Sequence, residues 1–332
     1  MGLSSDRIQD ALYGFARSQL LFTACDLDIF TQIANGHRVA PAIAKAIHVD
    51  LRALSIVLDG LVGIGFLDKH QSAYRLPPDV EKYLVKTSPS YMGGMVKHGK
   101  RLMDTWTQLT SVVKTGQPAG SAQGLAQLEA YFAELAKGLY VSNYPTAQQL
   151  AVMLDFHSAP KGVNILDVGG GTGVWSIALL EANADARATI LDYPTVVEIA
   201  REYVAKHELS ERVTYTPGDL EMLTLPPSTY DWTILANICH AIGPFSTAEL
   251  IGHVAEALKP GGKLVVVDFV PDDERSEPGW PLLFGVNEMI TTDEGNVFTQ
   301  AEYTQWFEAA GLSLASKHSL DGDVTALVAH KN

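Results

Sequence analysis

The segment Asp167-Val168-Gly169-Gly170-Gly171-Thr172-Gly173 is the feature that most narrows the fold of this chain. It ends the apolar run 164–168, which is typical of a buried strand, and it precedes the helix-like stretch 174–182. Glycine lets a backbone approach a ligand closely and adopts positive φ at little cost. A strand, a glycine loop and a helix in this order predict a nucleotide-binding site.

The second half of the chain alternates strands with helices. Further strands are predicted at 188–192, 213–216, 232–237 and 263–269, and helices at 194–207 and 246–258. This alternation predicts an α/β fold with a doubly wound, Rossmann-like parallel sheet. Two last strands, near 313–319 and 324–330, flank the tight turn Asp321-Gly322-Asp323, so the last strand is predicted to be antiparallel.

The first hundred residues have a different pattern. Helices are predicted at 6–24, 40–47 and 51–63, followed by a hairpin after Phe66, which is a winged-helix order. Apart from Arg52 and Asp59, the helix at 51–63 is almost entirely apolar, whereas a DNA-reading helix needs polar side chains. The sequence therefore predicts a mainly helical winged-helix domain at 1–100 that forms a homodimer. A helical connection at 101–160 is predicted to line an acceptor pocket. A cofactor-binding catalytic domain is predicted at 161–332.

Charge and composition exclude several classes of function. The net charge is −14, without the basic excess that a nucleic-acid partner requires. The two cysteines, Cys25 and Cys239, form no CxxC pair, and no metal site is expected. No apolar run reaches the roughly 18 residues that a membrane span needs, and residues 1–17 lack a signal-peptide pattern. We expect a cytoplasmic protein without membrane or nucleic-acid partners.

The spacing of the glycines distinguishes between nucleotides. The dinucleotide pattern GxGxxG, begun at Gly169, requires Gly or Ala at the position of Val174, which disfavours an NAD-dependent oxidoreductase. The pattern DxGxGxG fits instead, through Asp167, Gly169, Gly171 and Gly173. A dinucleotide carries a pyrophosphate that favours a helix N-terminus. S-adenosylmethionine carries a cationic sulfonium and an amino-acid tail, whose ammonium group an acidic residue can bind.

Two further acids follow the next two predicted strands. Asp192 ends the second strand, 25 residues after Asp167, where a carboxylate can accept hydrogen bonds from both ribose hydroxyls. Asp219 follows the third strand and is placed to accept from the adenine amino group, with Leu220 packing on the ring. Each acid alone could be a helix cap or a loop residue. Three acids at the ends of three consecutive strands favour S-adenosylmethionine, with Asn237 of the fourth strand as a further contact.

These residues, together with Asn237-Ile238-Cys239-His240 and the segment LKPGGKLVVVDF at 258–269, resemble the two-domain small-molecule O-methyltransferases of the plant caffeate and bacterial phenazine or hydroxyneurosporene type. The resemblance covers nearly the whole chain. It implies an N-terminal dimerisation domain and S-adenosylmethionine as cofactor. It also implies cofactor contacts at Gly169, Asp192, Asp219 and Leu220, and His240 as catalytic base.

The chain departs from that family around the histidine. The Asp and Trp that follow the plant histidine are Ala241 and Ile242 here, and the Lys four residues before it is Ala236. The Glu that orients the plant histidine is replaced by Val297. Asp293, Glu294 and Glu288 are candidates to orient His240 in its place. The histidine is either a general base, since imidazole titrates near neutral pH, or only a residue that lines the pocket.

The predicted reaction is in-line methyl transfer to a small-molecule acceptor, in which the enzyme aligns and deprotonates the acceptor. The expected acceptor group is a hydroxyl of an aromatic or polyketide-like metabolite. The predicted acceptor contacts, taken from the segment 280–298, are Trp280, Phe284, Asn287, Met289 and Ile290. C- or N-methylation on the same scaffold stays open. A winged-helix regulator is disfavoured by the apolar helix at 51–63.

Overall fold

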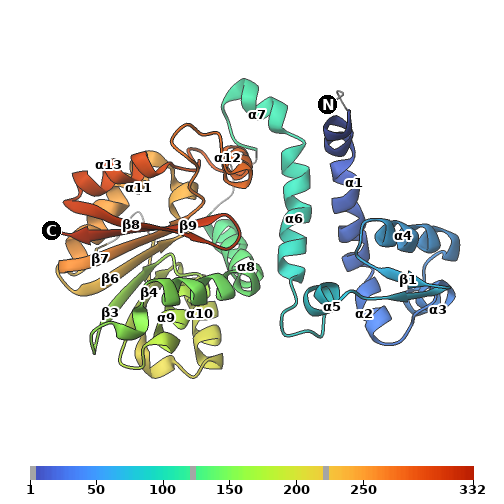
Figure 1. Cartoon of the computed structure of the whole chain (residues 1–332), viewed down its shortest axis with the longest axis horizontal. Coiled ribbons are helices and arrows are strands. Elements are labelled where there is room, and N and C mark those ends of the chain that lie inside the picture. The colour runs from blue at the N-terminus through green and yellow to red at the C-terminus, as the bar shows by residue number, and fades with distance from the viewer. Residues whose placement is uncertain (1–4, 120–124, 220–223) are drawn as a thin grey trace. The chain divides into compact units, whose positions relative to one another are not determined.

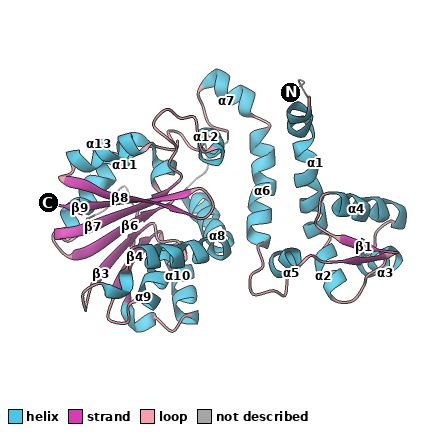
Figure 2. Cartoon of the chain, in the orientation of Figure 1, coloured by secondary structure: helices cyan, strands magenta, loops and turns pink. Residues whose placement is uncertain are grey.

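The structure is a computed structural model that describes residues 5–119, 125–219 and 224–332, and in 125–131 the backbone alone. The chain divides into two compact units, Met1–Met103 and Asp104–Asn332. Figures 1 and 2 show the elements of each unit.

The first unit is mainly helical. Its elements are α1 (Asp6–Asp26), α2 (Ile29–Ala34), α3 (Ala40–Ile47), α4 (Leu51–Gly63), the antiparallel pair β1 (Asp68–His70) and β2 (Ala73–Arg75), α5 (Pro78–Leu84) and most of α6 (Gly93–Trp106). The Asp50 carboxylate caps α4, accepting a 2.7 Å hydrogen bond from the backbone N of Ala53. Helices followed by a short hairpin confirm the winged-helix prediction. The short helices α2 and α5 were not predicted.

Helix α1 has an apolar side that the first unit does not cover. Ile8, Leu12, Tyr13 and Phe15 are each more than 60% exposed. Several exposed apolar side chains on one helix are typical of an interaction site in soluble proteins.

The second unit is built on a seven-stranded sheet in the order β5-β4-β3-β6-β7-β9-β8. The strands are β3 (Asn164–Val168), β4 (Arg187–Asp192), β5 (Val213–Pro217), β6 (Tyr230–Ala236), β7 (Leu258–Asp268), β8 (Leu312–Leu320) and β9 (Val324–Lys331). The pairs from β5 to β7 are parallel, and β9 runs antiparallel to both β7 and β8. The doubly wound sheet and its antiparallel strand are confirmed.

Helices cover both faces of this sheet, as Figure 2 shows. One face packs against α8 (Leu125–Met153), α9 (Val174–Ala182) and α10 (Pro194–Lys206). The other face packs against α11 (Cys239–Ala257) and α13 (Gln300–Ala309). Burial on both faces explains why these strands are near-continuous apolar runs. Helices α7 (Leu109–Thr115) and α12 (Gly279–Thr291) complete the unit, with short 3₁₀ turns at Phe156–Ser158 and Ser210–Arg212. Within the described residues, no helix is long and apolar enough to cross a membrane.

Two of the element boundaries that differ from the sequence prediction lie next to His240. Strand β6 ends at Ala236, because Asn237 adopts a left-handed φ of 56° and turns the chain. Helix α11 begins at Cys239 rather than near 246, and it is broken at Gly243, where φ is 80° and ψ is 171°. The first turn of this broken helix carries His240.

Candidate active site

The glycine loop joins β3 to α9 at the carboxyl edge of the sheet. Gly169, Gly171 and Gly173 have φ values of 64°, 60° and 75°, which residues other than glycine rarely adopt. A Cβ atom on Gly173 would also lie 2.7 Å from Cδ1 of Ile190 on β4. The loop is therefore held against β4 in a form that requires glycine.

Asp192 ends β4 beside this loop. Its Oδ2 accepts a 2.8 Å hydrogen bond from Gly171 N, and its Oδ1 accepts a 2.7 Å bond from Tyr193 N. Burial raises the pKa of Asp192 to about 6, although both backbone donors act against the rise. Asp219 is half-buried and lies just after β5, the strand that neighbours β4. Leu220 lies outside the described residues.

Asp167 lies beneath the loop rather than at its surface. It is fully buried, and its Oδ2 accepts from the backbone N and the Oγ of Ser176 at 3.2 and 2.7 Å, in the first turn of α9. Its Oδ1 is sealed from solvent without a hydrogen-bond partner, and burial raises its pKa to about 6. Within the protein, Asp167 ties the loop to the start of the helix.

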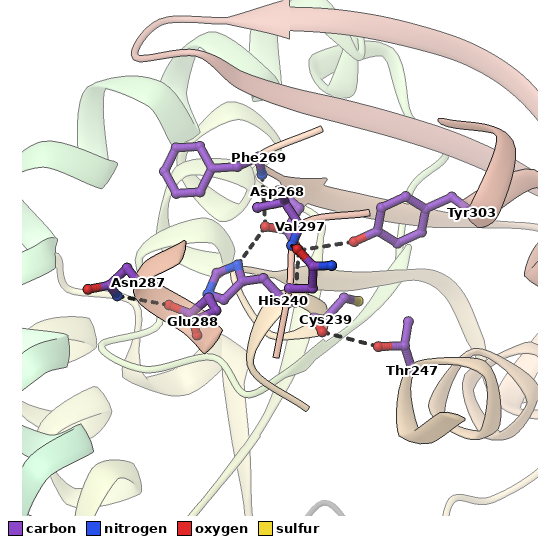
Figure 3. Close-up of polar contacts among 10 residues, drawn as sticks. Cys239, His240, Thr247, Asp268, Phe269, Asn287, Glu288, Val297 and Tyr303 are labelled. Atoms are coloured by element: carbon purple, nitrogen blue, oxygen red, sulfur yellow. Dashed lines mark hydrogen bonds and ion pairs between the residues drawn. The ribbon is translucent and has the colours of Figure 1, made fainter. Parts of the chain in front are cut away.

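His240 is held by a carboxylate that the sequence analysis missed. Nδ1 of His240 lies 2.6 Å from Oδ1 of Asp268, the last residue of β7 (Figure 3). Asp268 is itself fixed, since it accepts from Phe269 N at 2.8 Å and from the Tyr303 hydroxyl at 3.0 Å. A carboxylate only accepts, so Nδ1 carries the proton and Nε2 is left as the basic nitrogen. The orienting acid is thus Asp268 rather than any of Asp293, Glu294 and Glu288.

The surroundings of His240 favour its protonated form. Burial lowers the pKa of His240, but the charge and hydrogen bond of Asp268 and the charge of Glu288 outweigh it, so the net change is a rise. Glu288 of α12 is also buried, and burial raises the pKa of its carboxyl group. An imidazole that gains a proton here is stabilised by two carboxylates.

Aromatic side chains pack around the imidazole. The Phe284 ring meets the His240 ring edge-on, with 4.9 Å between centroids. Phe269 lies 4.6 Å from Phe284, and Trp280 lies 6.3 Å from Phe269, in both cases between ring centroids. Trp280 is 49% exposed. This aromatic cluster of Phe269, Trp280 and Phe284 places apolar rings next to the imidazole of His240.

The other predicted acceptor contacts lie differently. Asn287 is half-buried, accepts from the indole N–H of Trp106 at 3.1 Å and donates to Glu288. Ile290 is fully buried. Met289 lines an open hollow of about 440 Å³ with residues of α7 and of the segment 293–298. His240 and Asp192 do not line that hollow.

The acidic residues around the glycine loop fit S-adenosylmethionine better than a phosphate ligand. The acids Asp167, Asp192 and Asp219 end or follow three adjacent strands, and such a set repels a pyrophosphate and attracts a cation. In the described parts of the chain, no cluster of His, Cys, Asp and Glu could hold a metal ion.

A Rossmann-like sheet with this acidic glycine-loop site and a carboxylate-held histidine defines a methyltransferase. Residues 107–313 match the O-methyltransferase domain family, and residues 9–86 match the O-methyltransferase dimerisation domain. The chain belongs to this O-methyltransferase family, and it is an S-adenosylmethionine-dependent methyltransferase.

Several named proteins are similar to this chain over nearly its whole length. The tetracenomycin polyketide synthesis 8-O-methyl transferase TcmO of Streptomyces glaucescens is 28% identical over 97% of this chain and 94% of its own. The 3-hydroxy-5-methyl-1-naphthoate 3-O-methyltransferase of Streptomyces sahachiroi is 28% identical over 92% and 89%. The structure of human N-acetylserotonin methyltransferase in complex with SAM has the same fold, with a TM-score of 0.86, 24% identity and full coverage of both chains.

Proposed function

We propose that the enzyme methylates a hydroxyl group of an aromatic small molecule, with His240 as general base. The observation that carries this proposal is the histidine whose Nδ1 is held by Asp268 while its ring packs against the aromatic cluster. The two Streptomyces relatives are named for polyketide and naphthoate acceptors, which agrees with an aromatic hydroxyl compound.

His240 would take the acceptor's hydroxyl proton on Nε2 as the acceptor oxygen forms its bond to the methyl carbon. The imidazolium formed in this way would be stabilised by Asp268, which donates no proton and keeps the ring in one orientation. S-adenosylmethionine supplies the methyl group on an already activated sulfonium. The protein must therefore align the acceptor, exclude water and hold the proton.

For the cofactor, we propose contacts at Gly169, Gly171, Gly173, Asp192, Asp219, Leu220 and Asn237. Each carboxylate oxygen of Asp192 accepts one backbone hydrogen bond. Each oxygen has a further lone pair, with which it can accept from a ribose hydroxyl. Asp167 is proposed to act through the loop that it holds, because its side chain is fully buried. Asn237 leaves β6 in a left-handed conformation just before the helix that carries His240.

For the assembly, we propose a homodimer through residues 1–100, supported by the match to the dimerisation domain and by the exposed apolar side of α1. The helical connection at 101–160 is proposed to line the acceptor pocket of the catalytic domain at 161–332. A cytoplasmic location stays a prediction.

A screen with labelled S-adenosylmethionine tests this function. Phenols, naphthols, amines and β-keto acids are offered as separate groups, and the labelled product is identified as an ether, an amine or a C-methyl compound. We expect label in the ethers of phenols or naphthols. Label confined to amines or to carbon would overturn the O-methylation proposal and leave the cofactor assignment intact.

A further inference from the structure

One face of α12 combines the aromatic surface with a buried acid. Trp280, Phe284 and Glu288 are spaced four residues apart, which places them on the same side of the helix. Phe284 of this face contacts the His240 ring. Glu288 is only 6% exposed, although Glu is among the residues least often buried.

The Glu288 carboxylate is fixed in place with one oxygen uncommitted. Its Oε1 accepts from Asn287 Nδ2 at 3.1 Å, and Asn287 is in turn held by Trp106 (Figure 3 shows the first contact). Among the described residues, Oε2 has no hydrogen-bond partner. Among the described residues, the side-chain oxygens that lack both a partner and contact with solvent are those of Asp167 and Thr233. Oε2 of Glu288 is not one of them, so it is accessible from outside the protein.

Glu288 lies close to the base. Both residues pack around Gly295, since a Cβ atom there would lie 2.7 Å from the backbone O of His240 and 3.2 Å from Cβ of Glu288, and the charge of Glu288 raises the pKa of His240. The basic side chains described in the structure form no ion pair with Glu288. A buried carboxylate without a full set of donors is costly, so a donor arriving at Oε2 would be bound firmly.

Orientation of the imidazole does not explain this acid, because Asp268 already occupies Nδ1. We propose that Glu288 binds a second hydrogen-bond donor of the acceptor, so that the preferred acceptor is an aromatic ring that carries a hydroxyl or N–H next to the hydroxyl that is methylated. This inference rests on the proposed O-methylation and specifies its acceptor class. The aromatic cluster holds the ring, His240 takes the proton of one group, and Glu288 Oε2 accepts from the other.

The test compares catechol with guaiacol, in which the second oxygen is methylated and cannot donate. A naphthalene diol and its monomethyl ether form a second pair. For the wild-type enzyme we expect kcat/KM to be about ten- to a hundredfold higher for the diol of each pair, the usual worth of a hydrogen bond to a charged group. Calorimetry with S-adenosylhomocysteine bound should show the same ratio in acceptor Kd.

The variant Glu288→Gln keeps an oxygen for Asn287 but places an amide where Oε2 lies. Loss of the Glu288 charge lowers the pKa of His240 for both members of a pair alike, whereas only the diol also loses a hydrogen bond. We therefore expect kcat/KM to fall more for the diol, so that the preference for the diol disappears. The matched control is Asp293→Asn, which removes an exposed carboxylate five residues further along. It should keep the full preference.

Several results would overturn the inference. A wild-type enzyme that treats both members of each pair alike would refute it without any variant, which also covers the case that Glu288→Gln does not fold. If Glu288→Gln slows both members equally and moves the pH profile, Glu288 acts only through His240. Failure to methylate any hydroxyaromatic compound would instead refute the proposed function.

Discussion

The substitution Asp268→Asn tests the base assignment most directly. Asparagine has the same shape, so its amide oxygen can still accept from Phe269 N and from Nδ1 of His240. Its amide nitrogen can donate to the Tyr303 hydroxyl, and only the long 3.3 Å bond that Oδ2 accepts from His240 N is lost. The fold should therefore survive. What is lost is the negative charge opposite the imidazolium that forms as the acceptor gives up its proton.

The size of the loss follows from the geometry. With a 2.6 Å contact between Nδ1 and Oδ1, the centres of the two delocalised charges lie about 4–5 Å apart. At an effective dielectric constant of about 20, this attraction is about 3–4 kcal/mol. At about 1.4 kcal/mol for each factor of ten, kcat should fall by roughly 10²–10³.

The pH dependence gives a second readout with a definite sign. Asp268 raises the pKa of His240, and only the neutral imidazole can act as base, so wild-type kcat falls as the pH drops through that raised pKa. Removal of the charge lowers the pKa, so the acidic limb of the profile should move to lower pH while the plateau falls. Steady-state rates across pH 5–9, with cofactor affinity as the control, measure both. An Asp268→Asn enzyme with a wild-type plateau and an unmoved limb would refute the assignment of Asp268 and His240 as an acid–base pair.

Three further predictions concern the base, the cofactor and the assembly. His240→Ala should leave cofactor affinity nearly unchanged and lower kcat by about 10²–10⁴-fold, with partial recovery at high pH. A variant that keeps more than about a third of kcat between pH 6 and 9 would show that His240 is not the base. Asp192→Ala should weaken S-adenosylmethionine binding by about 1.5–3 kcal/mol, or roughly ten- to a hundredfold in Kd, and unchanged affinity in a folded variant would exclude Asp192 from the site. Light scattering at micromolar concentration should give the mass of a dimer, and a monomer mass would count against residues 1–100 as an interface.

The sheet could be predicted from the sequence because its strands are buried on both faces. An apolar run such as 164–168, ended by glycines, has few other structural explanations. The positions of Asp192 and Asp219 followed from the strand ends alone. Helix α2, with six residues, is too short to show a clear period.

Asp268 could not be found in the same way. It lies 28 residues from His240 and ends an apolar run, like many loop acids, and only the pairing of β6 with β7 brings the two together. The direction of side chains on α12 could not be predicted either: Ile290 is fully buried, whereas Phe284 contacts the His240 ring. Pairing between strands and rotation of a helix about its axis depend on tertiary packing, which a periodic pattern does not encode.

Because β6 pairs with β7, the position of the His240–Asp268 pair and the choice of acceptor depend on different parts of the fold. His240 follows β6 after the turn at Asn237, and Asp268 ends β7, so the pairing of these two strands brings the two side chains together. The surface that would choose the acceptor lies on α12, a helix outside the sheet. Substrate preference can therefore change through residues 279–291 while the hydrogen bond between His240 and Asp268 is kept. To change which ring system the enzyme methylates, we would replace α12 with the corresponding helix of a relative.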